Sequence, residues 1–106
     1  MEVKNNLDVI VDIAKKMIPL NQAFLFGSYA YGTPRQNSDY DLYFIVEKKE
    51  DSNYDTIVKL SSAIRNAINK PVDVLLRTKD EFYFRASNKT TLEHKVLNNG
   101  VQIYGQ

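Results

Sequence analysis

Two short apolar runs, separated by a glycine turn and a pair of aspartates, constrain the fold of this chain more than any other feature. The first run spans residues 23–26 and ends at Gly27, and the second spans residues 40–46, with Asp39 just before it and Asp41 inside it. Runs of this length and composition are typical of buried strands. A glycine turn directly after a strand suits a phosphate group, and two nearby carboxylates suit a divalent cation. The stretch therefore predicts two strands beside a site for a metal–nucleotide complex.

The rest of the chain predicts an α/β fold: a single-layer mixed β-sheet with helices packed on it. Apolar residues at helical spacing indicate two long amphipathic helices, and Thr followed three residues later by Glu predicts capping boxes at Thr78/Glu81 and Thr90/Glu93. The second long helix is expected to bury Ile57, Val58, Ile64, Ala67 and Ile68. In chain order we expect a helix over 3–19, strand 23–26, short helix 28–32, strand 40–46, a helix opened by Ser52, strand 72–76, helices 79–86 and 91–98 with Gly100 as the final cap, and a small edge strand over 101–104.

Composition excludes several classes of protein. A chain of 106 residues has room for one domain, which we place at 1–106. The net charge of +1 argues against a dedicated nucleic-acid or membrane-surface binder, and the lack of cysteine excludes disulfides and thiolate sites. The polar start has no apolar signal region, so a cytoplasmic protein is expected. His94, the only histidine, is expected to face solvent.

The paired aspartates require a partner for their charge. Side chains alternate between the two faces of a strand, so Asp39 and Asp41 lie on one face together with Tyr43. Carboxylates at this separation repel each other, and the strand contains no Lys or Arg. A divalent cation is the natural partner, and oxygen ligands favour Mg²⁺ or Mn²⁺. The opposite face is apolar and should pack against helices; it carries Tyr40, Leu42, Phe44 and Val46.

Asp73 is a third candidate carboxylate, because it interrupts the apolar run 72–76. A charge there is costly unless it is paired or faces a cavity or metal, so an internal hydrogen-bonded carboxylate and a site residue are both possible. If its strand neighbours 40–46, Asp73 can join the other two. Three carboxylates around two metals about 4 Å apart suit nucleotidyl transfer, with one placed to accept the proton of the attacking hydroxyl. Gly27 and Ser28 would bind the phosphates.

These residues resemble a known family. Gly27-Ser28, ten intervening residues and Asp39-Tyr40-Asp41 resemble the signature of the DNA polymerase β-type nucleotidyltransferase superfamily, and Val72-Asp73-Val74 resembles its third-carboxylate strand. The Gly-Ser-x-Ala-x-Gly run and the ending from Leu92 to Tyr104 are similar to the minimal nucleotidyltransferases of bacteria and archaea. The resemblance covers essentially the whole chain.

The resemblance implies the polymerase β-type nucleotidyltransferase fold, with Asp39 and Asp41 binding Mg²⁺ and Asp73 completing the metal site or acting as base. It implies that Gly27 and Ser28 bind the phosphates of ATP, with release of pyrophosphate. Minimal members of the family often act as antitoxins beside a small helical HEPN toxin, and some adenylylate a tyrosine on it. This chain is therefore expected to be an AMP-transferring antitoxin. The alternatives are a non-enzymatic antitoxin that neutralises its partner by complex formation, and a nucleotidyltransferase that acts on a small molecule.

Overall fold

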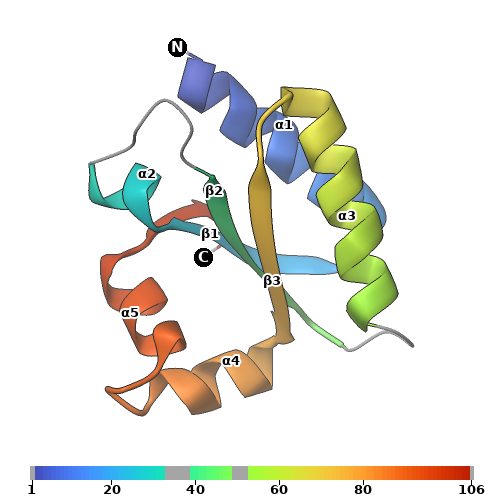
Figure 1. Ribbon diagram of the computed structural model, residues 1–106. Coiled ribbons are helices and arrows are strands. Elements are labelled where there is room, and N and C mark those ends of the chain that lie inside the picture. Colours follow the sequence, from blue (N-terminus) through green and yellow to red (C-terminus); the bar gives the residue numbers. More distant parts are fainter. Residues whose placement is uncertain (1, 33–38, 49–52, 106) are drawn as a thin grey trace.

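The structure is a computed structural model that describes residues 2–32, 39–48 and 53–105 (Figure 1). The expected order of helices and strands is confirmed, although the first strand begins three residues earlier and the third ends two residues later than expected. The elements are α1 (Glu2–Met17), β1 (Leu20–Phe26), α2 (Ser28–Tyr31), β2 (Tyr40–Val46), α3 (Asn53–Ile68), β3 (Val72–Thr78), α4 (Lys79–Ala86), α5 (Leu92–Asn99) and β4 (Val101–Tyr104).

The four strands form one mixed sheet in the order β3-β2-β1-β4. β1 pairs antiparallel with both β2 and β4, and β2 pairs parallel with β3. The parallel pair is connected through α3, as parallel strands require a long crossover. Residues 101–104 form the edge strand that the sequence predicts, and β3 is the strand at the opposite edge.

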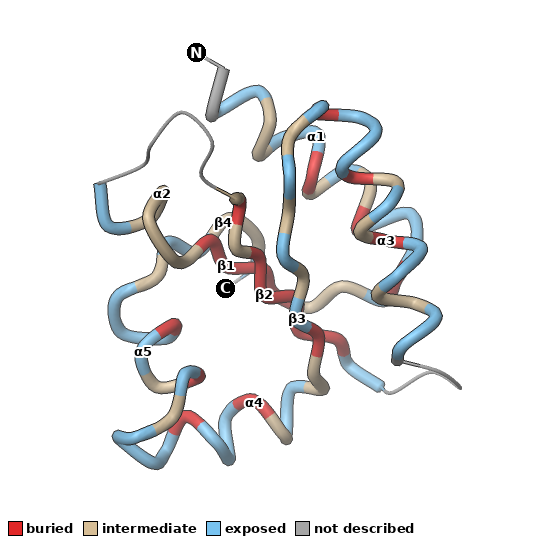
Figure 2. Tube along the Cα trace, in the orientation of Figure 1, coloured by how far each residue is buried: buried red, intermediate tan, exposed pale blue. Residues whose placement is uncertain are grey.

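Helices cover both faces of the sheet (Figure 2). One face packs against α1 and α3, and its core contains the four apolar side chains of β2 expected to face helices. The other face carries a smaller core around Phe24, Tyr43 and Phe82, with α4 and α5 over it. The alternation predicted for β2 is therefore confirmed, and Asp41 and Tyr43 lie on the face covered by α4 and α5.

The expected buried stripe of α3 is partly wrong. Val58 is 48% exposed and Ala67 is also exposed, whereas Leu60 is completely buried. Leu60, Ile64 and Ile68 recur every four residues, so they form one continuous stripe toward the sheet. Ser52, expected to open α3, and the charged residues 49–51 before it lie outside the described residues.

The helix caps agree with the sequence at one position and differ at another. The capping box at Thr78 and Glu81 is confirmed in both halves. The one expected at Thr90 and Glu93 is wrong, because the hydroxyl of Thr91 accepts the first-turn hydrogen bond and Glu93 is buried instead. Gly100 follows α5 as expected, and its N–H donates to the carbonyl of Val96. Within the described ranges, every helix is too short or too polar to cross a lipid bilayer.

Candidate active site

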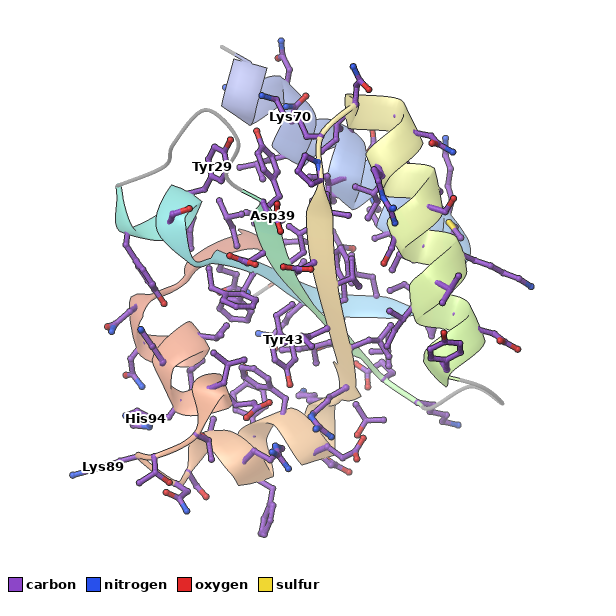
Figure 3. All side chains as sticks on the ribbon, in the orientation of Figure 1. Tyr29, Asp39, Tyr43, Lys70, Lys89 and His94 are labelled. Carbon is purple, nitrogen blue, oxygen red and sulfur yellow. The ribbon has the colours of Figure 1, made fainter. Side chains whose placement is uncertain are left out.

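The predicted site residues lie at one end of the sheet, near α2. Gly27 and Ser28 connect β1 to α2, and Asp39 directly precedes β2 (Figure 3). Asp41 and Asp73 are directly opposite each other in the parallel β2/β3 register, so their side chains project from the same face of the sheet. This pairing was a condition in the sequence argument, and the structure meets it.

Gly27 places the backbone of the turn against Asp41. Asp41 is opposite Phe26 in the β1/β2 register, and a methyl group built on Gly27 would lie 1.9 Å from an Asp41 carboxylate oxygen. Gly27 also has a φ of 74° and a ψ of −155°, a conformation that is essentially restricted to glycine. Two independent constraints, close approach and backbone conformation, therefore require glycine here.

The carboxylate pair is electrostatically strained. The pKa of Asp41 is raised from 3.8 to about 6, first by burial, then by the charge and hydrogen bond of Asp73, and finally by the charge of Asp39. Two carboxyl groups can share a hydrogen bond only while one of them holds a proton. No Lys or Arg within the described ranges forms an ion pair with Asp41 or Asp73. Among the described residues, the negative charge of this pair is therefore not balanced by a cationic side chain.

The pair fits a divalent cation in its chemistry, because carboxylate oxygens are the ligands that Mg²⁺ prefers and a cation would remove the repulsion that raises the pKa of Asp41. The structure brings two of the three predicted carboxylates into contact. Across residues 2–32, 39–48 and 53–105, no three acidic, histidine or cysteine side chains are grouped closely enough to hold a metal. Asp39 therefore acts on Asp41 through its charge, and the ligand roles of Asp39, Asp41 and Asp73 stay predictions.

A second acidic site on the same face was missed from the sequence. Glu93 lies in the first turn of α5, where it accepts a 2.7 Å hydrogen bond from the hydroxyl of Tyr43 and pairs with Arg85 at 3.2 Å and Arg77 at 3.5 Å. The available signal was Tyr43, whose polar hydroxyl lies in an apolar strand and needs a buried partner. His94 beside it is half-buried rather than solvent-facing, and its Nδ1 lies 2.9 Å from the carbonyl oxygen of Ala86.

Comparisons with known proteins agree with the fold. A Methanocaldococcus jannaschii protein, provisionally named a protein adenylyltransferase, is 29% identical over 100 residues that cover 89% of this chain and 97% of that protein. A toxin–antitoxin structure with AMP-PNP matches with a TM-score of 0.72 and 24% identity, over 95% of this chain and 74% of the matched chain. A tyrosine-to-alanine variant of the MntA–HpeT toxin–antitoxin matches with a TM-score of 0.70 and 29% identity, over 93% and 72%.

The fold is that of a nucleotidyl-transferring enzyme. Residues 8–106 match the family model described as polymerase beta, nucleotidyltransferase. The chain belongs to this family, and the resemblance inferred from Gly27-Ser28 and Asp39-Tyr40-Asp41 is confirmed at the level of family and fold.

Proposed function

We propose that this chain transfers AMP from ATP to a hydroxyl group of a protein, and that the acceptor is a tyrosine of a partner toxin. The observation that carries the proposal is the direct opposition of Asp41 and Asp73 in neighbouring strands, with Gly27 against the first of them. This arrangement places negative charge for a cation next to the turn that is proposed to bind a phosphate.

Each predicted residue has a role in this proposal. Asp39 and Asp41 would hold Mg²⁺, with Asp73 completing the site. When bound, the cation neutralises charge on the donor phosphates. Gly27 and Ser28 orient those phosphates, because glycine admits them close to the backbone and Ser28 offers its hydroxyl and its N–H.

The reaction exchanges a phosphoanhydride bond of ATP for a phosphoester bond to the acceptor. The acceptor oxygen attacks the α-phosphorus of ATP, the bond from that phosphorus to the bridging oxygen breaks, and pyrophosphate leaves with the electron pair. The proton of the acceptor hydroxyl passes to the carboxylate of Asp73, which lies beside Asp41 and is exposed at the strand edge. A positioned base of this kind contributes a factor of about 10²–10⁴ to the rate.

The relatives support the choice of acceptor. The archaeal relative carries the name of a protein adenylyltransferase, and the MntA–HpeT structure is a toxin–antitoxin complex at 29% identity. The toxin–antitoxin structure with AMP-PNP contains an analogue of the proposed donor. A protein acceptor supplied by a partner is consistent with all three.

The test is AMP transfer to the product of the neighbouring gene. Incubating the purified protein with that product, Mg²⁺ and ATP labelled in the α-phosphate should label the product. Asp41→Asn should abolish the label, and Asp12→Asn, an exposed aspartate of α1, should leave it unchanged. No label with the intact protein would contradict the proposal. Neutralisation of the toxin by a variant with both Asp39→Asn and Asp41→Asn would favour the non-enzymatic antitoxin.

A further inference from the structure

An open groove lies beside the carboxylate pair, along the outer edge of β3. Its volume is about 650 Å³. Lining residues come from both faces of the strand, because Leu75 and Arg77 project on the side of α5 whereas Leu76 belongs to the core beneath α3. The groove therefore opens across the strand edge rather than into the sheet. We call it the β3-edge groove; its other walls are formed by Arg85, Thr90, Leu92 and Glu93, among others.

The groove begins next to the candidate active site along β3. Asp73, Leu75 and Arg77 alternate along β3 and so project from one face, which places Leu75 one pleat away from Asp73. Leu75 is 38% exposed and Leu92, across the groove, is 41% exposed. Among the described residues β3 pairs only with β2, so its outer backbone groups face the groove side. Such an edge can accept an extended peptide.

The groove presents positive charge to solvent. Its acid, Glu93, has a side chain only 6% exposed and is enclosed by Tyr43 and two guanidinium groups. The side chains of Arg77 and Arg85 are 36% and 46% exposed. The contacts with Glu93 use the Nε atoms of both arginines, and an Nη atom of Arg77 also pairs with Glu81 at 3.7 Å. Two exposed guanidinium groups thus stand against one exposed carboxylate, that of Glu81, which leaves one net positive charge toward solvent. The surface available to a partner is therefore cationic with apolar patches.

We propose that the β3-edge groove binds an extended, acidic segment of the acceptor protein and so delivers its hydroxyl to Asp73. This inference rests on the proposed function, because it assigns the acceptor side of the same site. Gly27 and Ser28 lie beyond Asp41 on the β1 side, so the nucleotide and the acceptor approach from opposite sides of the pair. Arg77 is four residues from Asp73, roughly 13 Å along the strand. The acidic residues should accordingly lie about four residues from the acceptor tyrosine.

The probes are synthetic peptides with one tyrosine and two glutamates, placed four and five residues either before or after it, each matched by a peptide with glutamine instead. Binding is measured without nucleotide, by titration followed through NMR shifts of the amides of β3. We expect one of the two acidic peptides to bind at least threefold more tightly than its glutamine match, with shifts at Leu75 and Arg77. Equal binding of both pairs would overturn the proposal.

Variants at Thr90 separate electrostatics from structure. Thr90 is exposed on the groove wall, and its hydroxyl and N–H both contact Asn88, so Thr90→Lys and Thr90→Glu lose the same side-chain hydrogen bond. Thr90→Lys should tighten binding of the acidic peptide and Thr90→Glu should weaken it, each by about threefold at low salt, as expected for one partly screened charge. Asn99→Glu, at the far end of α5 from the groove, should change nothing.

The outcome also separates the groove from the proposed activity. If Thr90→Lys and Thr90→Glu shift affinity in the same direction, the charge does not govern binding and the proposal is wrong. If the acidic peptide binds as expected but receives no AMP with Mg²⁺ and ATP, the groove stands as a protein-binding site and the proposed transfer activity is wrong. If the peptide receives AMP, Thr90→Glu should raise the KM for peptide and leave the KM for ATP unchanged.

Discussion

Asp41 and Glu93 lie on the same face of the sheet, yet their surroundings shift their pKa values in opposite directions. Burial is the largest influence on both and raises the pKa in each case. At Glu93, hydrogen bonds from Tyr43, from the backbone and from Arg85 outweigh burial, and the pKa is lowered. At Asp41, the neighbours are Asp73 and Asp39, which add to burial. Within the part of the chain that the structure describes, Glu93 is therefore paired with cationic side chains and Asp41 is not.

The difference in pairing indicates that Glu93 has a structural role, whereas Asp41 and Asp73 have the features of a functional site. The partners of Glu93 come from β2, β3 and α4, so this acid connects three elements to α5 and is complete without a ligand. The carboxylates of Asp41 and Asp73 repel each other in a place where an apolar pair would cost less. Perturbed acids of the second kind are typical of functional sites, where an external charge completes the arrangement.

The largest expected effect follows from the contact that confines Asp41. Gly27→Ala would place a methyl group within 1.9 Å of its carboxylate and would impose a strained backbone, at a cost of about 3 kcal/mol in the free energy of unfolding. Gly32→Ala is the matched control, because Gly32 also has a positive φ but a methyl group there meets no atom within 4 Å; about 1 kcal/mol is expected. Urea unfolding measures both, and equal costs would show that Asp41 is not confined by Gly27.

The second prediction concerns the binding of Mg²⁺ to Asp41 and Asp73. Mg²⁺ at about one hundred times its dissociation constant should raise the free energy of unfolding by about 2.7 kcal/mol, and EDTA should reverse this gain. Asp41→Asn should lose most of the response, whereas Glu93→Gln should retain it, since Glu93 is already paired. Thermal unfolding at several Mg²⁺ concentrations provides the measurement. The same response in wild type and Asp41→Asn would refute the cation site.

The third prediction concerns the removal of the carboxylate of Glu93. Glu93→Gln should lower the free energy of unfolding by about 2 kcal/mol at pH 7, because it leaves Tyr43 and two arginines without their common partner. The pKa of Glu93 is lowered in the folded state, so its contribution is present above its ordinary value of 4.5 and is lost as the pH falls through the folded value. Asp8→Asn, on the exposed side of α1, should cost close to nothing. Urea unfolding at pH 7 and at lower pH measures these differences.

The comparison of Asp41 with Glu93 also shows which features of the site can be predicted from the sequence. The alternation of β2 and the identity of Asp41 as an interruption were readable, because both depend on residues adjacent in the chain. The partnership of Asp41 with Asp73 was not, because it depends on β3 lying next to β2 in one particular parallel register. Period-2 alternation fixes a face but does not fix the neighbouring strand.

At Glu93 the sequence pattern was present but the predicted structure did not form, because contacts with residues distant in the chain were stronger. Thr90 and Glu93 have capping-box spacing, but Thr91 caps the helix and the carboxylate of Glu93 is held by Tyr43 and Arg85. These partners are 50 and 8 residues away in the chain, and a charged pair in a partly buried setting outweighs a cap of about 1 kcal/mol. At Thr78 the predicted box forms even though Glu81 also pairs with Arg77, because that contact, at 3.7 Å on an exposed side chain, is weak.

The smallest expected effect concerns pH. The folded pKa of Asp41, about 6, exceeds its ordinary 3.8, so between these values the folded protein binds more protons than the unfolded chain. Stability must therefore fall as the pH rises from about 4 to about 6, which is opposite in sign to the contribution of Glu93. Allowing for solvent screening of a site open on one side, the loss should be about 1 kcal/mol.

Asp41→Asn tests this sign directly, because it removes the titrating group but keeps the shape of the side chain. In metal-free buffer, the variant should be more stable than wild type at pH 7, by about the same 1 kcal/mol, and the two proteins should converge near pH 4. Chemical unfolding at a series of pH values with EDTA present makes the comparison. A variant less stable than wild type at pH 7 would mean that the carboxylate of Asp41 is already compensated within the protein. Asp41 would then be a structural acid of the same kind as Glu93, and the case for a functional pair with Asp73 would lose its electrostatic basis.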